Sequence, residues 1–263
     1  DKLDLTTPAV SNLFQKTTLR FLPIAKVVFS RHDHVKSTAA LSNKSLSNID
    51  KNSPMKSTIC LLFFLLFTNA NQPSEDGVDL LANGLKGWNV AKSGAWKIDD
   101  GVLQPSEKPG GYIWTEKPYE NFELSLEYKT SEKCNSGVFF RTDPKNPVQG
   151  GFEIQLASHG LYSGKHIVGS LYDAQSPTES AGKPDGEWNK MTLTCLGPEI
   201  KVVLNGKKVL NANLNKWTTP KLNPDGTKNK FKTALKKLPR SGNIGFQYHG
   251  HPVSFRNLVI KQK

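Results

Sequence analysis

The stretch IKVVLNGKKVL, residues 200–210, decides the fold class of this chain. Two apolar runs flank the dipeptide Asn205-Gly206, which is the strongest short sequence signal for a two-residue β-hairpin turn. Residues 122–128 and 191–195 place apolar side chains at every second position, as half-buried strands do. The alternation continues near the C-terminus in NIGFQYHG and VSFRNLVI, which predict two more strands.

Helix signals are sparse, and residues 231–238 are the one segment in which we expect a short helix. Turn motifs punctuate the chain at residues 99–101, 183–186 and 223–226. Many short antiparallel strands with turns between them, over about two hundred residues, are typical of an all-β sandwich. We therefore predict a single domain, a β-sandwich of the jelly-roll kind.

The first 70 residues differ from the rest. Residues 1–54 show no sustained hydrophobic period, and we expect them to be an upstream extension outside the fold. This extension is either non-native, from an over-extended gene model, or a genuine long leader or disordered arm. Met55 and Lys56 then precede nine apolar residues and a small-residue site, the layout of a signal peptide over 55–70. This apolar run is too short to span a bilayer, so no stable membrane insertion is expected. The pattern predicts a mature domain over 71–263 that is secreted or periplasmic.

Charge and cysteine content limit the partners. The formal net charge is +12, and the basic run 228–240 is predicted to be a solvated loop or short surface helix without a nucleic-acid partner.

Cys134 and Cys195 form either a disulfide or, as we favour, two separate core contacts. No cofactor is predicted, and calcium on the separate loop aspartates Asp173, Asp185 and Asp225 stays an open alternative.

Large polar residues gather on one face of several predicted strands. In residues 150–160 (GGFEIQLASHG) three apolar side chains alternate with Glu153 and Gln155, and His159 follows. The same alternation turns Gln247 and His249 away from the core. Because successive side chains of a strand point to opposite faces, Arg141 and Arg256 are also expected to point away from the core. Each residue alone could be ordinary solvated surface, but together they predict the floor of a site.

Six segments carry a family resemblance. In order they are NSGVFFR (135–141), FEIQ (152–155), GSLYD (169–173), KPDGEWNKMTL (183–193), GPEIKVVLNGKKV (197–209) and GNIGFQYHGHPVSFRNLVIK (242–261). Together they resemble the 3-keto-disaccharide hydrolase domain family over about residues 77–262. The resemblance implies a concanavalin A-like jelly-roll sandwich, export from bacterial cells, and action on a carbohydrate substrate, a 3-keto-glycoside.

A chemistry for such a substrate needs three kinds of group: a base near C2, a donor to the enolate oxygen and an acid for the leaving oxygen. For the substrate that the resemblance implies, Glu153 or His249 is suited to act as the base, and Tyr172 could protonate the leaving oxygen. The enolate stabiliser is expected to be Arg141 or Arg256. The residues expected to bind sugar hydroxyls are Asn135, Gln155 and Gln247, with Arg256 counted among the substrate-binding residues.

Two other functions compete with this prediction. β-Glucanases of the same fold use the strand signature E-x-D-x-x-E. Here Gln155 and Ser158 stand at the later two positions, which argues against hydrolysis by paired carboxylates. The second alternative is a non-catalytic module that binds carbohydrate, as lectin-type and laminin G-like sandwiches do. The oligomeric state is not predicted.

Overall fold

The structure is a computed structural model that describes residues 77–106 and 109–263. The predicted extension and signal peptide lie outside these residues. The thirteen strands are β1 (Val78–Asp79), β2 (Trp88–Val90), β3 (Trp96–Asp99), β4 (Val102–Pro105), β5 (Tyr112–Thr115), β6 (Phe122–Thr130), β7 (Asn135–Thr142), β8 (Phe152–Ala157), β9 (Asn189–Leu196), β10 (Glu199–Leu204), β11 (Lys207–Asn213), β12 (Asn243–Gln247) and β13 (Val253–Gln262). Three short 3-10 helices complete the list: η1 (Gly164–His166), η2 (Leu214–Lys216) and η3 (Leu235–Lys237).

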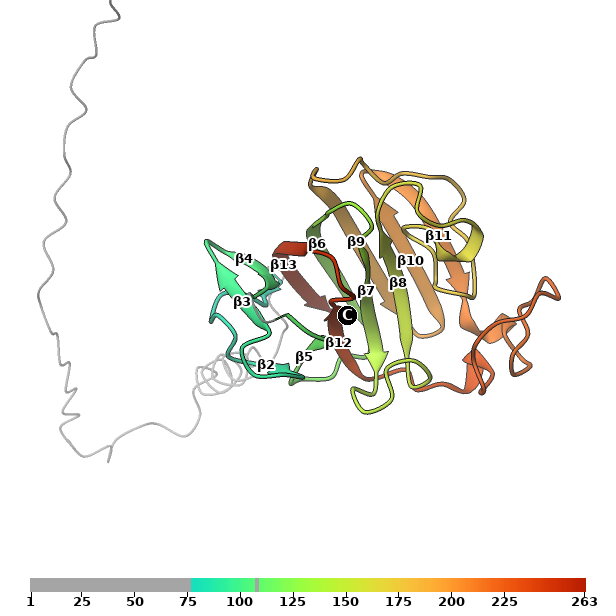
Figure 1. The fold of residues 1–263 in the computed structure, drawn as a ribbon. Coiled ribbons are helices and arrows are strands. Elements are labelled where there is room, and N and C mark those ends of the chain that lie inside the picture. The colour runs from blue at the N-terminus through green and yellow to red at the C-terminus, as the bar shows by residue number, and fades with distance from the viewer. Residues whose placement is uncertain (1–76, 107–108) are drawn as a thin grey trace, which may run out of the picture. The chain divides into compact units, whose positions relative to one another are not determined.

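The strands form two antiparallel sheets that pack face to face (Figure 1). The eight-stranded sheet has the order β11-β10-β9-β6-β13-β4-β3, with β1 paired to β13. The five-stranded sheet has the order β2-β5-β12-β7-β8. Several neighbouring strands are distant in sequence, among them β6 and β13, β13 and β4, and β5 and β12, as in a jelly roll. The predicted concanavalin A-like jelly-roll sandwich is confirmed.

The core lies between the sheets because most strands alternate as the sequence predicts. On β6 every second residue from Phe122 is buried, and on β8 the residues Phe152, Ile154 and Leu156 face the same core. The rings of Phe246 and Phe255 lie 4.2 Å apart between centroids and join the two sheets. This single cluster fixes which face of each strand remains for a site.

The hairpin and the four other predicted strands are all present. Asn205 has a φ of 51° between β10 and β11, the left-handed conformation that this turn requires. Cys134 and Cys195 are both buried free thiols, which agrees with separate core packing.

The helix predicted over 231–238 is wrong except for the single turn η3. In an α-helix over this range Lys236 N would donate to the carbonyl four residues earlier, but it donates to Trp217 O at 3.3 Å, and Lys237 N donates to Ala234 O, three residues earlier. Long-range hydrogen bonds also hold the start of the segment. Lys230 N donates to the Asp173 carboxylate, and Lys232 N donates to Gln149 Oε1 at 2.9 Å. The apolar side chains of this segment are buried, so it lies as a loop packed against the sandwich.

The outer edge of β8 is covered by residues 169–172. Gly169 N donates to Gln155 O at 2.9 Å, and Tyr172 N donates to Glu153 O at the same distance. This pairing explains why all six residues of β8 are buried although β8 ends its sheet. It also places Tyr172 beside Glu153.

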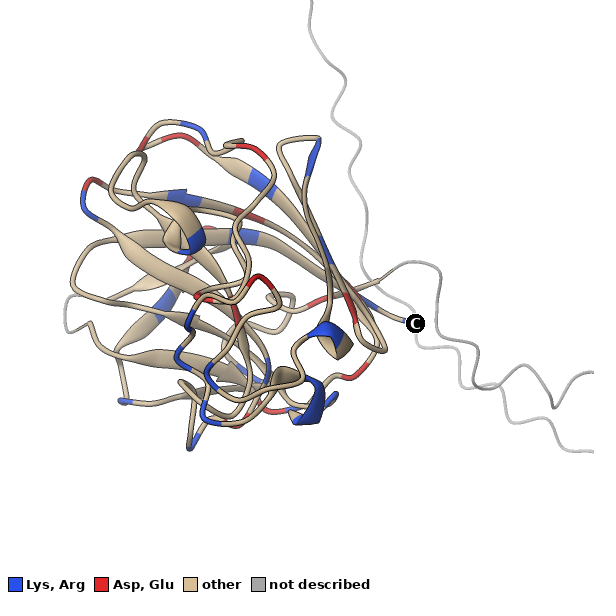
Figure 2. Ribbon diagram, turned by 90° about the vertical axis from the view of Figure 1, so that its right-hand side faces the viewer, with Lys and Arg blue, Asp and Glu red and all other residues tan. Residues whose placement is uncertain are grey.

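Basic and acidic residues are interspersed over the loops and strands of the described part (Figure 2). No helix among the described residues is long and apolar enough to cross a membrane.

Candidate functional site

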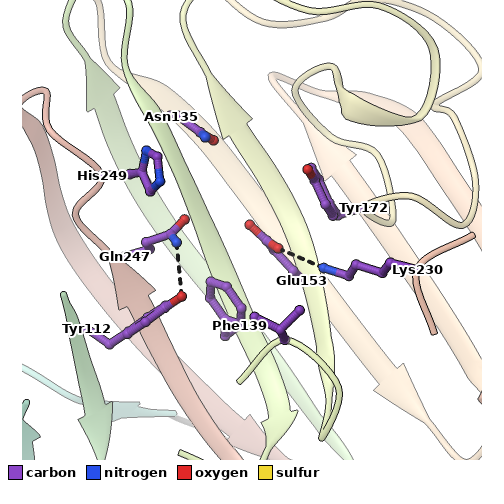
Figure 3. A pocket seen from close by; sticks show the side chains of 9 residues that line it. Tyr112, Asn135, Phe139, Glu153, Tyr172, Lys230, Gln247 and His249 are labelled. Atoms are coloured by element: carbon purple, nitrogen blue, oxygen red, sulfur yellow. Dashed lines mark hydrogen bonds and ion pairs between the residues drawn. The ribbon is translucent and has the colours of Figure 1, made fainter. Parts of the chain in front are cut away.

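A cleft of about 230 Å³ lies on the face of the five-stranded sheet that points away from the core. Strands β5, β7, β8 and β12 and the loops beside them supply its walls (Figure 3). The lining residues are Tyr112, Asn135, Phe139, Val148, Glu153, Tyr172, Lys230, Gln247 and His249. Nearly all are polar or aromatic, a composition suited to a sugar ring.

Glu153 forms the floor of this cleft. Its side chain is only 9% exposed, because the loops after β8 and β11 close over it. Burial raises the pKa of the Glu153 carboxyl to about 7, and the charge of Lys230 opposes this rise without cancelling it. A carboxyl with a pKa near neutral is suited to general-base catalysis.

Lys230 reaches the same floor from the loop before β12. Its Nζ lies 3.7 Å from Glu153 Oε2 and 4.3 Å from the centre of the Tyr172 ring. Burial lowers the pKa of the Lys230 ammonium, and the neighbouring charges of Glu153 and Asp173 oppose the change. The cleft therefore holds a carboxylate and a cation side by side.

Asp173 holds this lysine in place. Its carboxylate accepts a hydrogen bond from Lys230 N, and Oδ1 lies 3.1 Å from His166 Nε2. Its backbone carbonyl accepts from Asn223 Nδ2 at 3.3 Å. One residue thus connects the loop after β8 to the loop that carries Lys230.

The opposite wall is built from an aromatic cluster and an amide. Gln247 Nε2 lies 3.1 Å from Tyr112 Oη, to which it donates. The Tyr112 ring stacks on Trp114 at 5.1 Å between centroids and meets the edge of Phe139 at 5.3 Å. Packing on both sides fixes the Tyr112 hydroxyl at the rim.

Asn135 is oriented by a buried neighbour. Gln155 is 1% exposed, and its Nε2 donates to Asn135 Oδ1 at 3.2 Å. Because the Asn135 oxygen accepts this hydrogen bond, its amide nitrogen is the group that Asn135 can offer as a donor in the cleft that it lines. Gln155 Oε1 has no hydrogen-bond partner among the described residues.

Gly137 makes room for the Glu153 carboxylate. A Cβ atom at this position of β7 would lie 2.3 Å from Glu153 Oε1 and 2.7 Å from its Cγ. The close approach means that any side chain on Gly137 displaces the carboxylate.

Five of the eight predicted site residues line the cleft: Asn135, Glu153, Tyr172, Gln247 and His249. Gln155 lies beneath them, bonded to Asn135. His159, which follows β8, is exposed and lies outside the cleft.

The predicted placement of Arg141 is wrong. Its backbone has a φ of 50°, which interrupts the strand alternation at that residue. The side chain is wholly buried and donates to Glu120 O and Gly197 O at 2.7 to 2.8 Å. Its role is to hold backbone together at one end of the sandwich.

The predicted placement of Arg256 in the site is also wrong. Arg256 lies on β13 in the eight-stranded sheet, while the cleft lies on the other sheet. Its Nε donates to Glu127 at 2.7 Å, and its guanidinium lies 4.0 Å from the Trp188 ring centre. Strand parity gave the correct face but could not show which sheet contains the strand.

The three loop aspartates are engaged separately. Asp185 accepts from Thr130 and Ser158, Asp173 from Lys230 N, and Asp225 from Thr227. Within residues 77–106 and 109–263, no group of three or more His, Cys, Asp or Glu is arranged to hold a metal ion.

Lys230, Tyr112 and Phe139 also line the cleft and were not predicted from the sequence. Lys230 lies in the basic run that was predicted to be solvated, and no periodicity in a loop could mark it. On their strands, Tyr112 and Phe139 stand at the alternate positions that face away from the core. The alternation of apolar and polar residues could therefore have identified both.

A jelly-roll sandwich with a polar, aromatic-lined cleft on one sheet is an architecture of lectins and carbohydrate-processing proteins. The profile of the 3-keto-α-glucoside-1,2-lyase-like domain matches residues 77–261. The chain therefore belongs to this family, as the sequence resemblance predicted.

Known relatives agree with this membership. A 3-keto-disaccharide hydrolase of Bacteroides thetaiotaomicron is 26% identical over an alignment 215 residues long, and the match covers 68% of this chain and 74% of the relative. The crystal structure of a candidate glycosyl hydrolase from Parabacteroides distasonis is 35% identical, with a TM-score of 0.67 over 71% of this chain and 98% of that one. A second candidate glycosyl hydrolase from that organism shares the fold at 24% identity, with a TM-score of 0.57 over 70% of this chain and 93% of its own. These similarities support a function of the glycoside hydrolase kind.

Proposed function

We propose that this protein cleaves the glycosidic bond of 3-keto-glycosides by elimination followed by addition of water. A C3 ketone acidifies the proton on C2, and the glycosidic oxygen on C1 stands β to that ketone. Transfer of the C2 proton to Glu153 leaves an enolate. Its collapse breaks the C1–O bond and forms a C1–C2 double bond conjugated with the restored ketone. The leaving oxygen takes a proton and departs as an alcohol, and water then adds to C1 while C2 regains a proton.

One observation carries the proposal: the buried Glu153 carboxylate, with a pKa of about 7, lies 3.7 Å from the Lys230 ammonium on the cleft floor. A base that titrates near neutral pH is matched to removing a carbon-bound proton activated by a ketone. The adjacent Lys230 ammonium would stabilise the negative charge that develops on the enolate oxygen. The sequence had suggested an arginine for this role.

The remaining side chains can bind and orient the sugar. Asn135 and Gln247 offer amide groups to the ring hydroxyls. Tyr172 and His249 stand on opposite sides of Glu153 (Figure 3), and either can protonate the leaving oxygen. Glu153 is the single carboxylate among the nine described side chains that line the cleft. This favours elimination over the paired-carboxylate hydrolysis of glucanases.

The test is cleavage of a methyl 3-keto-glucoside in D₂O, followed by NMR. Glu153→Gln is expected to lower the rate about 100- to 10,000-fold, the usual effect of losing a general base. Deuterium is expected at C2 of the product formed by the unaltered protein. The control is Glu187→Gln, because Glu187 is exposed and does not line the cleft. A fully active Glu153→Gln protein would overturn the proposal, and binding without cleavage by the unaltered protein would favour the carbohydrate-binding alternative.

We also propose that the protein acts outside the cytoplasm, on the strength of the signal-peptide pattern at 55–70. N-terminal sequencing of the native protein is expected to start near Asn71. A native N-terminus within residues 1–54 would contradict export by this signal.

A further inference from the structure

A second cavity borders the cleft at the end of β8. Its volume is about 200 Å³, and the proposed chemistry uses none of its side chains. The lining residues are Ala157, Ser158, His159, Gly160, Tyr162, Ile167, Val168 and Ser180.

The strand register shows that the two cavities are neighbours. Glu153, Gln155 and Ala157 follow one another on the same face of β8. Ala157, which lines the second cavity, pairs across the sheet with Asn135, which lines the cleft. At about 3.3 Å of rise per residue, Glu153 and Ala157 lie about 13 Å apart. Two linked six-membered rings span a comparable length.

One segment forms a wall of both cavities. Between β8 and residue 172 the chain contributes Tyr162, Ile167 and Val168 to the second cavity and Tyr172 to the cleft. Burial is the main cause that raises the pKa of Tyr172, and an electrostatic interaction with the Tyr162 phenol is the smallest, so the two phenol groups are close. In Figure 3 Asn135 lies near His249 on one side of Glu153, and Tyr172 lies on the other side.

The lining of the second cavity favours a ring with an apolar face. Ala157, Ile167 and Val168 are apolar, and Tyr162 stands 39% exposed at the rim, where a ring can stack on it. The Ser158 hydroxyl is already bonded to Asp185. A cavity of about 150 Å³ holds a benzene ring, so this one has room for a single six-membered ring.

We propose that the second cavity is the aglycone subsite: it holds the leaving alcohol, a six-membered ring with an apolar face, while the 3-keto sugar occupies the cleft. The inference rests on the proposed function and deepens it. The glycosidic oxygen then lies at the border of the two cavities, near Asn135. Because Tyr172 lies on the segment that forms a wall of both cavities, it is the donor of the proton to the leaving oxygen.

The test compares three 3-keto-glucosides whose leaving alcohols are methanol, benzyl alcohol and a second glucose. Methanol and benzyl alcohol have similar acidity, so their comparison reports on binding rather than on leaving-group chemistry. Ser180→Trp fills the cavity from an exposed position, and Tyr162→Ala removes the stacking ring. Ser93→Trp is the control, because Ser93 is exposed and lines neither cavity.

Both cavity variants are expected to lower kcat/KM for the benzyl glycoside about tenfold and to leave the methyl glycoside unchanged. A parallel loss for the disaccharide identifies a sugar as the occupant, and a loss for the benzyl compound alone identifies an aryl group. If neither cavity variant lowers kcat/KM for the benzyl glycoside or the disaccharide below that of the unaltered protein, the subsite is overturned while the proposed function stands. Failure of the unaltered protein to cleave any of the three would overturn the proposed function and the subsite with it.

Discussion

Glu153 shows how one residue takes a functional character from its surroundings. The same carboxyl on an exposed strand would titrate near its usual value of 4.5, but burial moves its pKa to about 7. The folded protein thus retains the Glu153 proton at a pH where the unfolded chain has released it. The contribution of Glu153 to the free energy of unfolding is therefore highest below the unfolded pKa of 4.5, and it is lost as the pH rises from there to the folded pKa of about 7.

This linkage predicts the pH dependence of Glu153→Gln. Between about pH 4.5 and 7 the free energy of unfolding of the unaltered protein should fall relative to that of the variant, by on the order of 3 kcal/mol at most. Denaturant melts of both proteins at pH 4.5, 6 and 8 measure the difference. A difference that does not change with pH would show that the carboxyl titrates equally in the folded and unfolded states.

Gly137 is the residue that permits this arrangement. Gly137→Ala forces a Cβ to within 2.3 Å of Glu153 Oε1, so the carboxylate must move. A displacement of about 1 Å can cost about a hundredfold in rate. We expect such a loss of kcat with a destabilisation of about 1 to 3 kcal/mol. Steady-state kinetics and a thermal melt measure both quantities.

The control for this substitution is Gly110→Ala. A Cβ at Gly110 would meet only Lys92 Cδ, at the ordinary contact distance of 3.6 Å, and its backbone φ is not positive. Equal activity of the two alanine variants would contradict a positioning role for Gly137.

At the scale of the elements, strand alternation predicted much of the site. It placed Glu153 on β8, and Gln247 and His249 on or just after β12, on one outward face, and the structure brings them together. It failed at Arg141 because a single residue with a φ of 50° interrupts the alternation on β7. It could not find Lys230 because a loop has no period, and the position of that loop depends on long-range contacts to Asp173 and Gln149.

Asp173 connects the loop after β8 to the loop that carries Lys230, and replacing it should affect Glu153. Asp173 has a φ of 60°, and Asn tolerates that conformation, so Asp173→Asn should fold. The variant loses the carboxylate that holds Lys230 N and faces His166, and Lys230 then approaches Glu153 less closely. Because the lysine opposes the rise in the Glu153 pKa, the acid limb of the pH–rate profile should move to higher pH. A purely structural loss would lower the rate without moving that limb.

Asp225→Asn is the matched control for this experiment. Asp225 lies on the loop that carries Lys230, is exposed, and forms its hydrogen bonds with Thr227. Its pH–rate profile should coincide with that of the unaltered protein. A shift of the same size in both variants would assign the effect to net charge and not to the position of Lys230.

At the scale of the whole molecule, composition and turn spacing predicted the sandwich, but no sequence pattern showed which strands share a sheet. This limit explains Arg256, whose outward face was predicted correctly but which lies on β13 and not on the sheet that bears the cleft. It also explains why the pairing of the cysteines stayed open. Cys134 follows β6 at one end, while Cys195 pairs in register with Phe122 at the other, so the length of a nine-residue strand separates them.

The two thiols can therefore report whether the sandwich unfolds as one unit. Both are 0% exposed, and burial raises the pKa of each to about 12, so neither should react with a thiol reagent at pH 8 while the protein is folded. In denaturant without reductant, peptide mapping should find both labelled, and the two labelling rates should agree if one cooperative transition exposes both ends of β6. Faster labelling of Cys134 than of Cys195 would show that the end of the sandwich near Asn135 and the second cavity opens before the rest. Absence of label on both in denaturant would reveal a disulfide and contradict the free thiols.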